Sequence, residues 1–383
     1  MKIGLVAGEA SGDLLGAGLI RALRERLPNA SFEGIAGPAM VAAGCEQWEP
    51  SESLAVMGLI EPIAHIPRLL RLRKELCRRW LASPPDVFVG IDAPDFNLGL
   101  EKKLRKSGIK TIHYVSPSIW AWRPGRIHTV REAVDRVLCI LPFEKPLYDE
   151  QGVDAVFVGH PKADRLPAVS DCLVTRQQLG IDAAEVVAVL PGSRAGEVSR
   201  LGGILADAAK QLTATRPGLH FVTPVATPKL RPIIEQQINE AGVAESFTLL
   251  DGNSETAMIA ADVVLLASGT AALESALLGK PTIAAYRVAP MTAAIAIAFR
   301  LVKLTHYTLP NLLTETPLVP EFIQRDAKPG PIAAAVAGML DDPERRRSIS
   351  NEFAKLRSEL ALDADQRAAE AVVELARQNH AAG

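Results

Sequence analysis

The sequence predicts an α/β protein of two tandem domains, each built on a parallel, doubly wound sheet. In the first half of the 383-residue chain, short apolar runs alternate with helical patterns, and the same alternation restarts near residue 186. Strand–helix alternation of this kind implies right-handed crossovers between parallel strands. The length also fits two domains, because each half is long enough to bury a core of its own.

The first half contains six apolar runs with the length of buried strands, and helical stretches separate most of them. The expected strands are Ile3–Ala7, Phe32–Ala36, Val87–Ile91, Thr111–Val115, Val137–Leu141 and Val156–Val158. An amphipathic helix is expected at Leu14–Leu27, where Pro28 stops it. The stretch Lys162–Ser170, which contains Pro167, is predicted to be a linker.

The second half repeats the pattern. Its expected strands are Val186–Leu190, Phe221–Val225, Phe247–Leu250, Val263–Ala267 and Thr282–Tyr286. Its expected helices are Arg200–Thr213, Lys229–Ala241, Ser254–Ala260 and Thr270–Leu278. These patterns predict Rossmann-like domains at 1–165 and 166–345, with sheets facing a cleft that suits a ligand. A charged helical tail, 346–383, could return to the first domain or pair with another chain as a homodimer.

Composition excludes several classes of protein. Hydrophobic residues make up 48% of the chain, charged residues 22%, and the net charge is −2, as in ordinary globular proteins. No nucleic acid partner is expected, and the scattered cysteines and histidines predict neither disulfides nor a metal site.

The chain opens on a strand, so no secretory signal is expected. The most apolar long segment, Val288–Phe299, is shorter than the roughly 20 residues of a spanning helix.

One segment combines apolar and basic residues. Apolar side chains fill Leu54–Leu72, and a basic cluster extends to Arg79. Such a segment could rest in a membrane interface and attract anionic lipid, or it could be a core-facing helix with a solvated basic face. The residues that would face the membrane are Met57, Leu59, Ile60, Ile63, Ile66 and Leu69, with Arg68 and Arg71.

The strand within Asp86–Asn97 runs directly into two carboxylates, Asp92 and Asp95, on either side of Pro94. Parallel sheets bind ligands just beyond the carboxyl ends of their strands. An acid in this place is therefore a candidate for chemistry. Because Asp is also a favoured helix cap, we predict that Asp95 caps the following helix and that Asp92 acts on substrate.

The first strand ends in a turn at Gly8–Asp13, which is not a dinucleotide-binding fingerprint, so no nicotinamide or flavin cofactor is expected. Its glycines permit close backbone approach, and Ser11 or Asp13 is expected to cap the next helix. Glu9 could act in the site or merely interact with the helix dipole.

A later strand ends in an aromatic and basic segment. Trp120, Trp122 and Arg123 could line an acceptor pocket, because aromatic faces stack on sugars and arginines bind phosphate. Tryptophans are equally common as core residues, so both readings stay open.

Two strand-to-helix turns in the second half suit a diphosphate. Gly192, Ser193 and Arg194 offer backbone donors beside an arginine, unless Arg194 is held by Glu197 in a salt bridge. Ser268, Gly269 and Thr270 offer hydroxyls and backbone N–H groups, and Glu274 lies one helical turn further on, where it could bind ribose. Without a Walker lysine, the two turns predict a nucleotide diphosphate site that lacks P-loop chemistry.

Together these segments resemble the lipid-A-disaccharide synthase family over essentially the whole chain. The matching segments are Gly8–Asp13, Gly90–Asn97, His113–Trp122, Leu190–Arg194, Leu266–Glu274 and Leu309–Leu313. The resemblance implies a GT-B inverting glycosyltransferase without cofactor or metal. Its donor would be UDP-2,3-diacylglucosamine, its acceptor 2,3-diacylglucosamine 1-phosphate (lipid X), and its products UDP and the β-1,6-linked lipid A disaccharide 1-phosphate. The implied place is the cytoplasmic face of the bacterial inner membrane.

The resemblance also implies roles for residues. Asp92 would be the base that takes the acceptor 6-hydroxyl proton, Glu9 and Ser11 would face a sugar, and Asn311 would lie near the nucleotide. Lipid substrates favour the membrane-facing interpretation of the apolar and basic segment. Two other classes remain: a UDP-sugar epimerase of the same fold, and a lipid-binding protein whose nucleotide site is vestigial.

Overall fold

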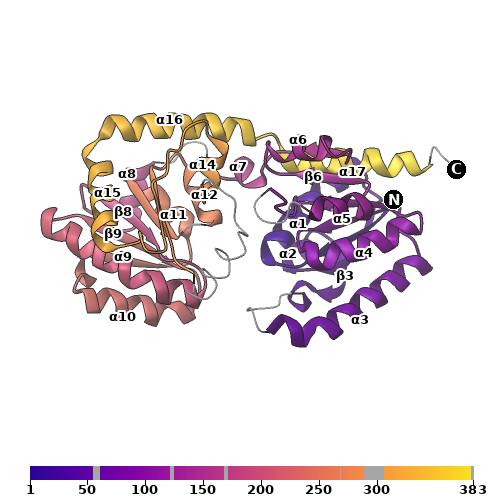
Figure 1. Ribbon diagram of the computed structural model, residues 1–383, viewed down its shortest axis with the longest axis horizontal. Helices are drawn as coiled ribbons and strands as arrows, with labels where there is room; N and C mark the ends of the chain where they lie inside the picture. The colour runs from indigo at the N-terminus through magenta and orange to yellow at the C-terminus, as the bar shows by residue number, and fades with distance from the viewer. Residues whose placement is uncertain (55–60, 121–124, 168–170, 268, 289–305, 381–383) are drawn as a thin grey trace. The chain divides into compact units, whose positions relative to one another are not determined.

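The computed structural model describes residues 1–54, 61–120, 125–167, 171–267, 269–288 and 306–380 (Figure 1). It divides into two compact units. Unit 1 combines Met1–Asp164 with the C-terminal segment from Leu360, and unit 2 is Arg165–Glu359. Each unit contains its own parallel sheet, so the predicted two-sheet α/β fold is confirmed.

Unit 1 contains a seven-stranded parallel sheet in the order β3-β2-β1-β4-β5-β6-β7. The six predicted strands are present, and β3 was missed. This edge strand carries exposed Glu46 and ends at Pro50, which are features of edges rather than of buried strands. The strands are β1 (Lys2–Ala7), β2 (Ser31–Ala36), β3 (Cys45–Pro50), β4 (Val87–Ile91), β5 (Lys110–Tyr114), β6 (Arg136–Cys139) and β7 (Ala155–Phe157).

Helices cover both faces of this sheet. They are α1 (Ala10–Arg26), α2 (Pro38–Ala42), α3 (Glu61–Ala82), α4 (Pro94–Lys106), α5 (Arg126–Ala133), α6 (Glu144–Asp149), α7 (Pro161–Arg165) and α17 (Ala364–His380), with a 3₁₀ turn at Ser51–Ser53. The predicted linker at Lys162–Ser170 is wrong at its start, because α7 occupies that part. Pro161 stands in the first turn of α7, where its missing N–H costs no hydrogen bond.

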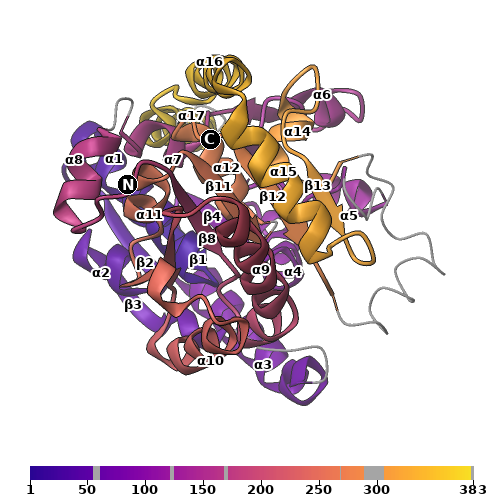
Figure 2. The same ribbon diagram turned by 90° about the vertical axis from the view of Figure 1, so that its left-hand side faces the viewer.

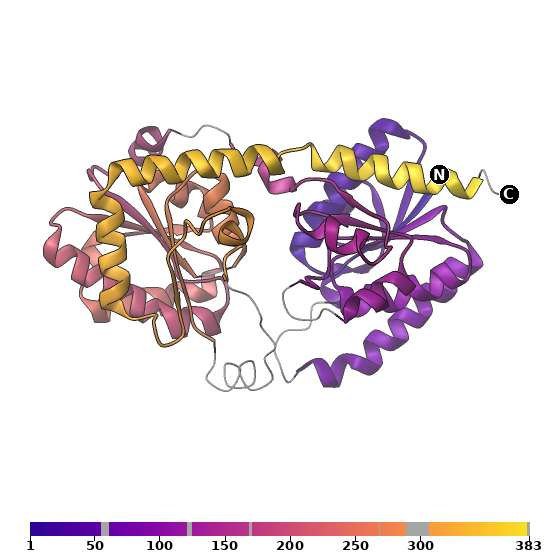
Figure 3. The same cartoon turned by 45° about the horizontal axis from the view of Figure 1, so that its top comes forward.

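Helix α17 completes the core of unit 1 and lies along it in Figures 1 and 3. Its apolar face, which includes Val372 and Leu375, joins the same buried cluster as Ile3 and Leu5 of β1. Arg136 at the start of β6 secures the helix. Its Nη1 donates to the Ala371 carbonyl at 3.1 Å and to Glu374 Oε2 at 2.8 Å. Of the two arrangements left open for the tail, α17 has the return to the first domain.

Unit 2 contains a six-stranded parallel sheet in the order β10-β9-β8-β11-β12-β13. Four of these strands, β8, β11, β12 and β13, are labelled in Figure 2. All five predicted strands are present. The short edge strand β13 was missed because it begins with Glu321 and none of its residues is buried, so it gives no apolar run. The strands are β8 (Val186–Leu190), β9 (His220–Val225), β10 (Phe247–Asp251), β11 (Val263–Ala267), β12 (Thr282–Tyr286) and β13 (Glu321–Ile323).

The helices of unit 2 pack on both faces of this sheet, with α9 between α10 and α15. They are α8 (Cys172–Gln178), α9 (Ala195–Thr215), α10 (Arg231–Ala241), α11 (Ser254–Ala260), α12 (Thr270–Leu277), α14 (Leu309–Leu313), α15 (Pro329–Asp341) and α16 (Pro343–Leu360), with 3₁₀ turns at Pro228–Leu230 and Ala244–Ser246. Among the helices described in the two units, none has the length and apolarity needed to cross a bilayer.

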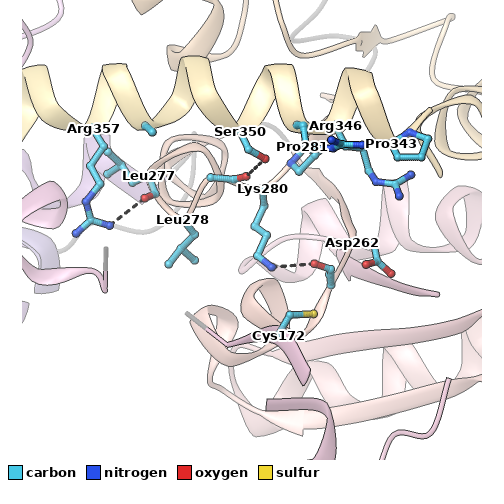
Figure 4. Close-up of a pocket in the computed structure, with 14 residues that line it drawn as sticks. Cys172, Asp262, Leu277, Leu278, Lys280, Pro281, Pro343, Arg346, Ser350 and Arg357 are labelled. Atoms are coloured by element: carbon cyan, nitrogen blue, oxygen red, sulfur yellow. Dashed lines mark hydrogen bonds between the residues drawn. The ribbon is translucent and has the colours of Figure 1, made fainter. Parts of the chain in front are cut away.

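A basic cavity of about 560 Å³ lies beneath α16, at the edge where β11 and β12 begin (Figure 4). Its polar groups largely bond to backbone carbonyls. Ser350 Oγ donates to the Gly279 carbonyl at 2.7 Å, Arg357 Nη1 to that of Leu277 at 3.1 Å, and Lys280 Nζ to that of Ala261 at 3.0 Å. Burial lowers the pKa of Lys280. The Ser350 and Arg357 contacts anchor α16 to the end of α12 and the turn before β12, at the sheet edge opposite to the predicted nucleotide turns.

Candidate functional site

Unit 1 has a cavity of about 580 Å³ at the carboxyl edge of its sheet. The turn after β1 contributes Gly8 and Glu9, and the turn after β4 contributes Asp92 through Phe96. Apolar side chains of α3 form another wall. The remaining lining residues are Leu54, Ile66, Leu69, Leu70 and Arg73. The cavity therefore combines carboxylates with a largely apolar wall and one arginine among its lining residues.

Asp92 lies in a strained turn. Its φ is 52° and that of Ala93 is 43°, so two consecutive residues with a Cβ occupy the left-handed region. Such conformations cost free energy and cluster at functional sites. Backbone contacts fix the turn: the Asp92 N–H donates to the Tyr114 carbonyl at 2.9 Å, and Asn97 Nδ2 donates to the Asp92 carbonyl at 2.8 Å. The carboxylate is left half-buried at the cavity.

Gly8 allows the first turn to meet this one. A Cβ at Gly8 would lie 2.7 Å from the Cβ of Ala93, closer than two carbon atoms can pack. Glu9 follows at the cavity lining with an exposed side chain. Ser11, in the first turn of α1, is also exposed. The sequence therefore identified correctly that close backbone approach is required at this turn.

The predicted cap of α4 is wrong. The N-cap residue is Ala93, and Asp95 stands within the first helical turn, where its carboxylate pairs with Arg126. The left-handed conformation of Ala93 starts the helix two residues earlier than an Asp95 cap would. Asp95 also lines the cavity.

The predicted cap of α1 is wrong as well. Its N-cap is Glu9, which makes no side-chain cap hydrogen bond. The buried Asp13 carboxylate instead accepts three backbone hydrogen bonds at 2.9 Å, from the N–H groups of Gly37, Ala39 and Met40. It satisfies the N-terminus of α2, a contact with a partner too distant in sequence to be read from local pattern.

The predicted acceptor segment is only partly described. Trp120 is half-buried: its Nε1 donates to Glu144 Oε1 at 3.1 Å, and its ring meets that of Phe143 edge-on. Trp122 and Arg123 lie outside the described residues. Sequence reasoning missed Glu144, which is 2% exposed and whose pKa is raised by burial to about 7. In the sequence, Glu144 could have been noticed as an acid that follows shortly after the apolar run of β6.

Unit 2 has a cavity of about 600 Å³ at the carboxyl edge of its own sheet. It brings together both predicted phosphate turns, contributing Gly192, Ser193 and Arg194 from one, and Gly269, Thr270 and Glu274 from the other. The turn after β10, Gly252–Ser254, adds a third wall that sequence reasoning missed. Its signal was Asp-Gly-Asn-Ser directly after an apolar run.

Arg194 has the salt bridge that was its alternative interpretation. Its side chain is 77% exposed, and Nη1 lies 3.2 Å from Glu197 Oε1. Glu197 also accepts from the Ser193 N–H at 3.3 Å, and a Cβ at Gly192 would clash with it at 2.8 Å. The turn thus surrounds a carboxylate with donors that suit an oxyanion. A diphosphate in the cavity would meet the same donors.

Two other predicted residues lie differently. Ser268 is outside the described residues. Asn311 is buried, and its amide holds the segment before β13: Nδ2 donates to the Val319 carbonyl at 2.8 Å and to Glu321 Oε1 at 3.0 Å, while Oδ1 accepts from the Leu318 and Val319 N–H groups. The described residues contain no group of three or more His, Cys, Asp or Glu side chains suited to a metal ion.

The fold is that of the GT-B class of glycosyltransferases and related sugar-nucleotide enzymes. Similar solved structures include a UDP-GlcNAc 2-epimerase from Neisseria meningitidis bound to UDP-GlcNAc, with a TM-score of 0.62, 13% identity, and 99% and 100% of the two chains covered. A glycosyltransferase from Rickettsia africae ESF-5 aligns with a TM-score of 0.61 and 12% identity over 99% and 98%. Identities this low support the fold alone.

The family model described as lipid-A-disaccharide synthetase matches residues 3–375. The lipid-A-disaccharide synthase of Xylella fastidiosa (strain 9a5c) is 48% identical over 379 residues, which cover 98% of each chain. That of Xanthomonas campestris pv. campestris (strain 8004) is 48% identical over 98% of this chain and 86% of its own. The chain belongs to the lipid-A-disaccharide synthase family, and the glycosyltransferase class and family predicted from the sequence are confirmed.

Proposed function

We propose that the enzyme joins UDP-2,3-diacylglucosamine to 2,3-diacylglucosamine 1-phosphate with inversion. The products are the β-1,6-linked disaccharide 1-phosphate and UDP. Family membership supports this reaction, and the observation that carries the mechanism is the half-buried Asp92 carboxylate in its strained turn beside an apolar wall. That wall suits acyl chains, and Arg73 among the lining residues suits the acceptor phosphate.

In this mechanism Asp92 accepts the proton of the acceptor 6-hydroxyl as its oxygen attacks the anomeric carbon. A new glycosidic C–O bond forms on one face of the sugar while the bond to UDP breaks on the other. The electron pair of the broken bond leaves on the diphosphate. Arg194 and the backbone N–H groups at the starts of α9 and α12 would stabilise that charge, so no metal is needed.

Incubation of the enzyme with UDP-2,3-diacylglucosamine, with and without lipid X, tests the proposal. We expect disaccharide and UDP in equal amounts, and only when both substrates are present. A change in the donor sugar without acceptor would indicate an epimerase. Binding of both lipids without any product would indicate a lipid-binding protein, and either result would overturn the proposal.

Arg194→Ala is expected to weaken UDP binding by about 1.5–3 kcal/mol, the range for hydrogen bonds to charged groups. This corresponds to roughly a tenfold to 100-fold rise in the UDP dissociation constant, which titration calorimetry measures. Glu197→Gln is the matched control. It removes the carboxylate that now holds Arg194 and should bind UDP at least as tightly as wild type. Unchanged UDP affinity in Arg194→Ala would remove this turn from the phosphate site.

We further propose that α3 docks on an anionic membrane surface on the cytoplasmic side of the inner membrane, where lipid substrates can be taken up. Ile66 and Leu70 are 46% and 49% exposed, beside exposed Arg68 and Arg71. Leu69 instead packs partly against the core, so its membrane-facing role is at most partial. Met57, Leu59 and Ile60 lie outside the described residues, as does the side chain of Ile63.

The double variant Ile66→Ser/Leu70→Ser is expected to lose most of its binding to anionic phospholipid vesicles. The substitutions remove two exposed apolar side chains that would be buried in the membrane interface, and membrane binding depends on that buried apolar area. Vesicle co-sedimentation measures this. Leu173→Ser/Val174→Ser is the matched control, since both residues are exposed on α8 of unit 2. Equal sedimentation of the two variants and wild type would restore the interpretation of α3 as a core-facing helix with a solvated basic face.

A further inference from the structure

Three polar side chains are completely buried directly behind the Asp92 turn. Asn97 and Glu101 lie one turn apart on α4, and His113 lies on β5; the exposed fraction of each is 0%. Residues four apart share one face of a helix, so Asn97 and Glu101 both face the sheet. On that sheet His113 is the cross-strand partner of Gly90 in β4.

Asn97 ties the turn to the strands around it. Its Nδ2 donates to the Asp92 carbonyl at 2.8 Å and lies 3.4 Å from the carbonyls of Val6 and Ile91. One amide therefore bridges the ends of β1 and β4 and a residue held in the left-handed region. This contact fixes the main chain of Asp92, which is one of the residues that line the cavity.

Glu101 and His113 hold the helix against the sheet. Glu101 Oε1 lies 2.8 Å from His113 Nδ1. Gly90 makes room for the pair, since a Cβ there would lie 2.1 Å from Glu101 Oε1 and 3.0 Å from the Asn97 side chain. The pair thus sets the distance between α4 and β4, on which the contact of Asn97 with Asp92 depends.

Stability does not account for this pair. A buried polar or charged pair can often be replaced by well-packed apolar side chains of similar size without loss of stability. The cluster is also incompletely satisfied: Asn97 Oδ1, Glu101 Oε2 and His113 Nε2 are buried without a hydrogen-bond partner within the described ranges. Burial raises the pKa of Glu101, against the opposing effect of His113. A costly polar cluster beneath a strained turn indicates a role in the site.

We propose that Asn97 and the Glu101–His113 pair are positioning residues that hold the Asp92 carboxylate in its reactive place. The inference rests on the proposed function, in which Asp92 is the base. In this role, the cluster affects only the rate of the chemical step. Acceptor and UDP binding depend on other groups and should be left unchanged.

The test is Glu101→Leu/His113→Leu, which replaces the pair with apolar side chains. We expect a melting temperature at or above that of wild type, an acceptor KM within about twofold, and a kcat lowered roughly 10- to 100-fold, as for small misplacements of a reacting group. His220→Leu is the control, because this histidine is hydrogen-bonded to Thr248 in the other unit and should leave kcat unchanged. A folded double variant with the wild-type kcat would overturn the inference.

Asn97→Ala gives an independent measurement if the double variant does not fold. It should lower kcat with little change in KM, and the loss should vanish in an Asp92→Asn background, where no base remains to be positioned. Equal losses in both backgrounds would overturn the positioning role while leaving the base assignment intact. Full activity of Asp92→Asn itself would instead overturn the proposed mechanism.

Discussion

Asp92→Asn should lower the rate of disaccharide formation roughly 10²- to 10⁴-fold while leaving UDP binding close to wild type. The amide has the size of the carboxylate but cannot take the acceptor proton, and general base catalysis is worth roughly 10²- to 10⁴-fold. The fold of the turn should survive, since the contacts of Asp92 with Tyr114 and Asn97 use its main chain. Single-turnover product formation and UDP titration measure the two effects.

The control for this variant is Asp171→Asn. Asp171 caps α8 in unit 2 through hydrogen bonds to the Leu173 and Val174 N–H groups, and Asn caps helices equally well. This variant should keep the wild-type rate. An Asp92→Asn enzyme that retains more than about a tenth of the rate would remove Asp92 as the base, because the loss would fall below the usual contribution of such a group.

Glu144 is expected to make unit 1 less stable as the pH rises from about 4.5 to about 7. At the ordinary carboxyl pKa of 4.5 the unfolded chain releases its proton, whereas burial keeps Glu144 protonated in the folded state up to about 7. Across this window the folded state binds more protons, so the free energy of unfolding falls with pH. The full effect is about 3 kcal/mol, reached above pH 7.

Glu144→Gln should remove this part of the pH dependence, because the amide still accepts from Trp120 but does not titrate. Urea unfolding between pH 4.5 and 8 measures it. All four tryptophans lie before residue 123, so their emission reports on unit 1. Parallel stability curves for variant and wild type across this range would contradict the prediction.

Much of the fold could be predicted because buried parallel strands are continuous apolar runs. Val87–Ile91, Val186–Leu190 and Val263–Ala267 have the bounds read from the sequence. Of the four edge strands in the described sheets, β3 and β13 escaped, because β3 is charged and β13 is a short strand that begins with Glu321 and has no buried residue. The same physics located the candidate sites: parallel strands end at one edge, so turns far apart in sequence meet there, as at the unit 2 cavity.

The errors concern side chains whose partners are distant in sequence. Asp13 was one of the two residues considered as the cap of its own helix, but its three donors lie at least 24 residues away. The Glu101–His113 contact joins a helix to a strand, and no local pattern marks either residue as buried. For Arg194, the sequence left two partners open, Glu197 and a bound phosphate, because both are compatible with its position three residues before Glu197. Local sequence shows which segments form strands and helices and which turns lie at the carboxyl edge of a sheet. The contacts of these side chains depend instead on tertiary packing.

The position of α17 has a consequence for synthesis. The wall of the unit 1 core that packs on α1, β4 and β5 is made by α17 (Ala364–His380), so the ribosome must synthesise this helix before the core of unit 1 can close. Unit 2 is uninterrupted in sequence and can complete its core earlier. During translation the nascent N-terminal region therefore exposes an apolar groove. Apolar surface that is transiently exposed in this way favours aggregation of incomplete chains.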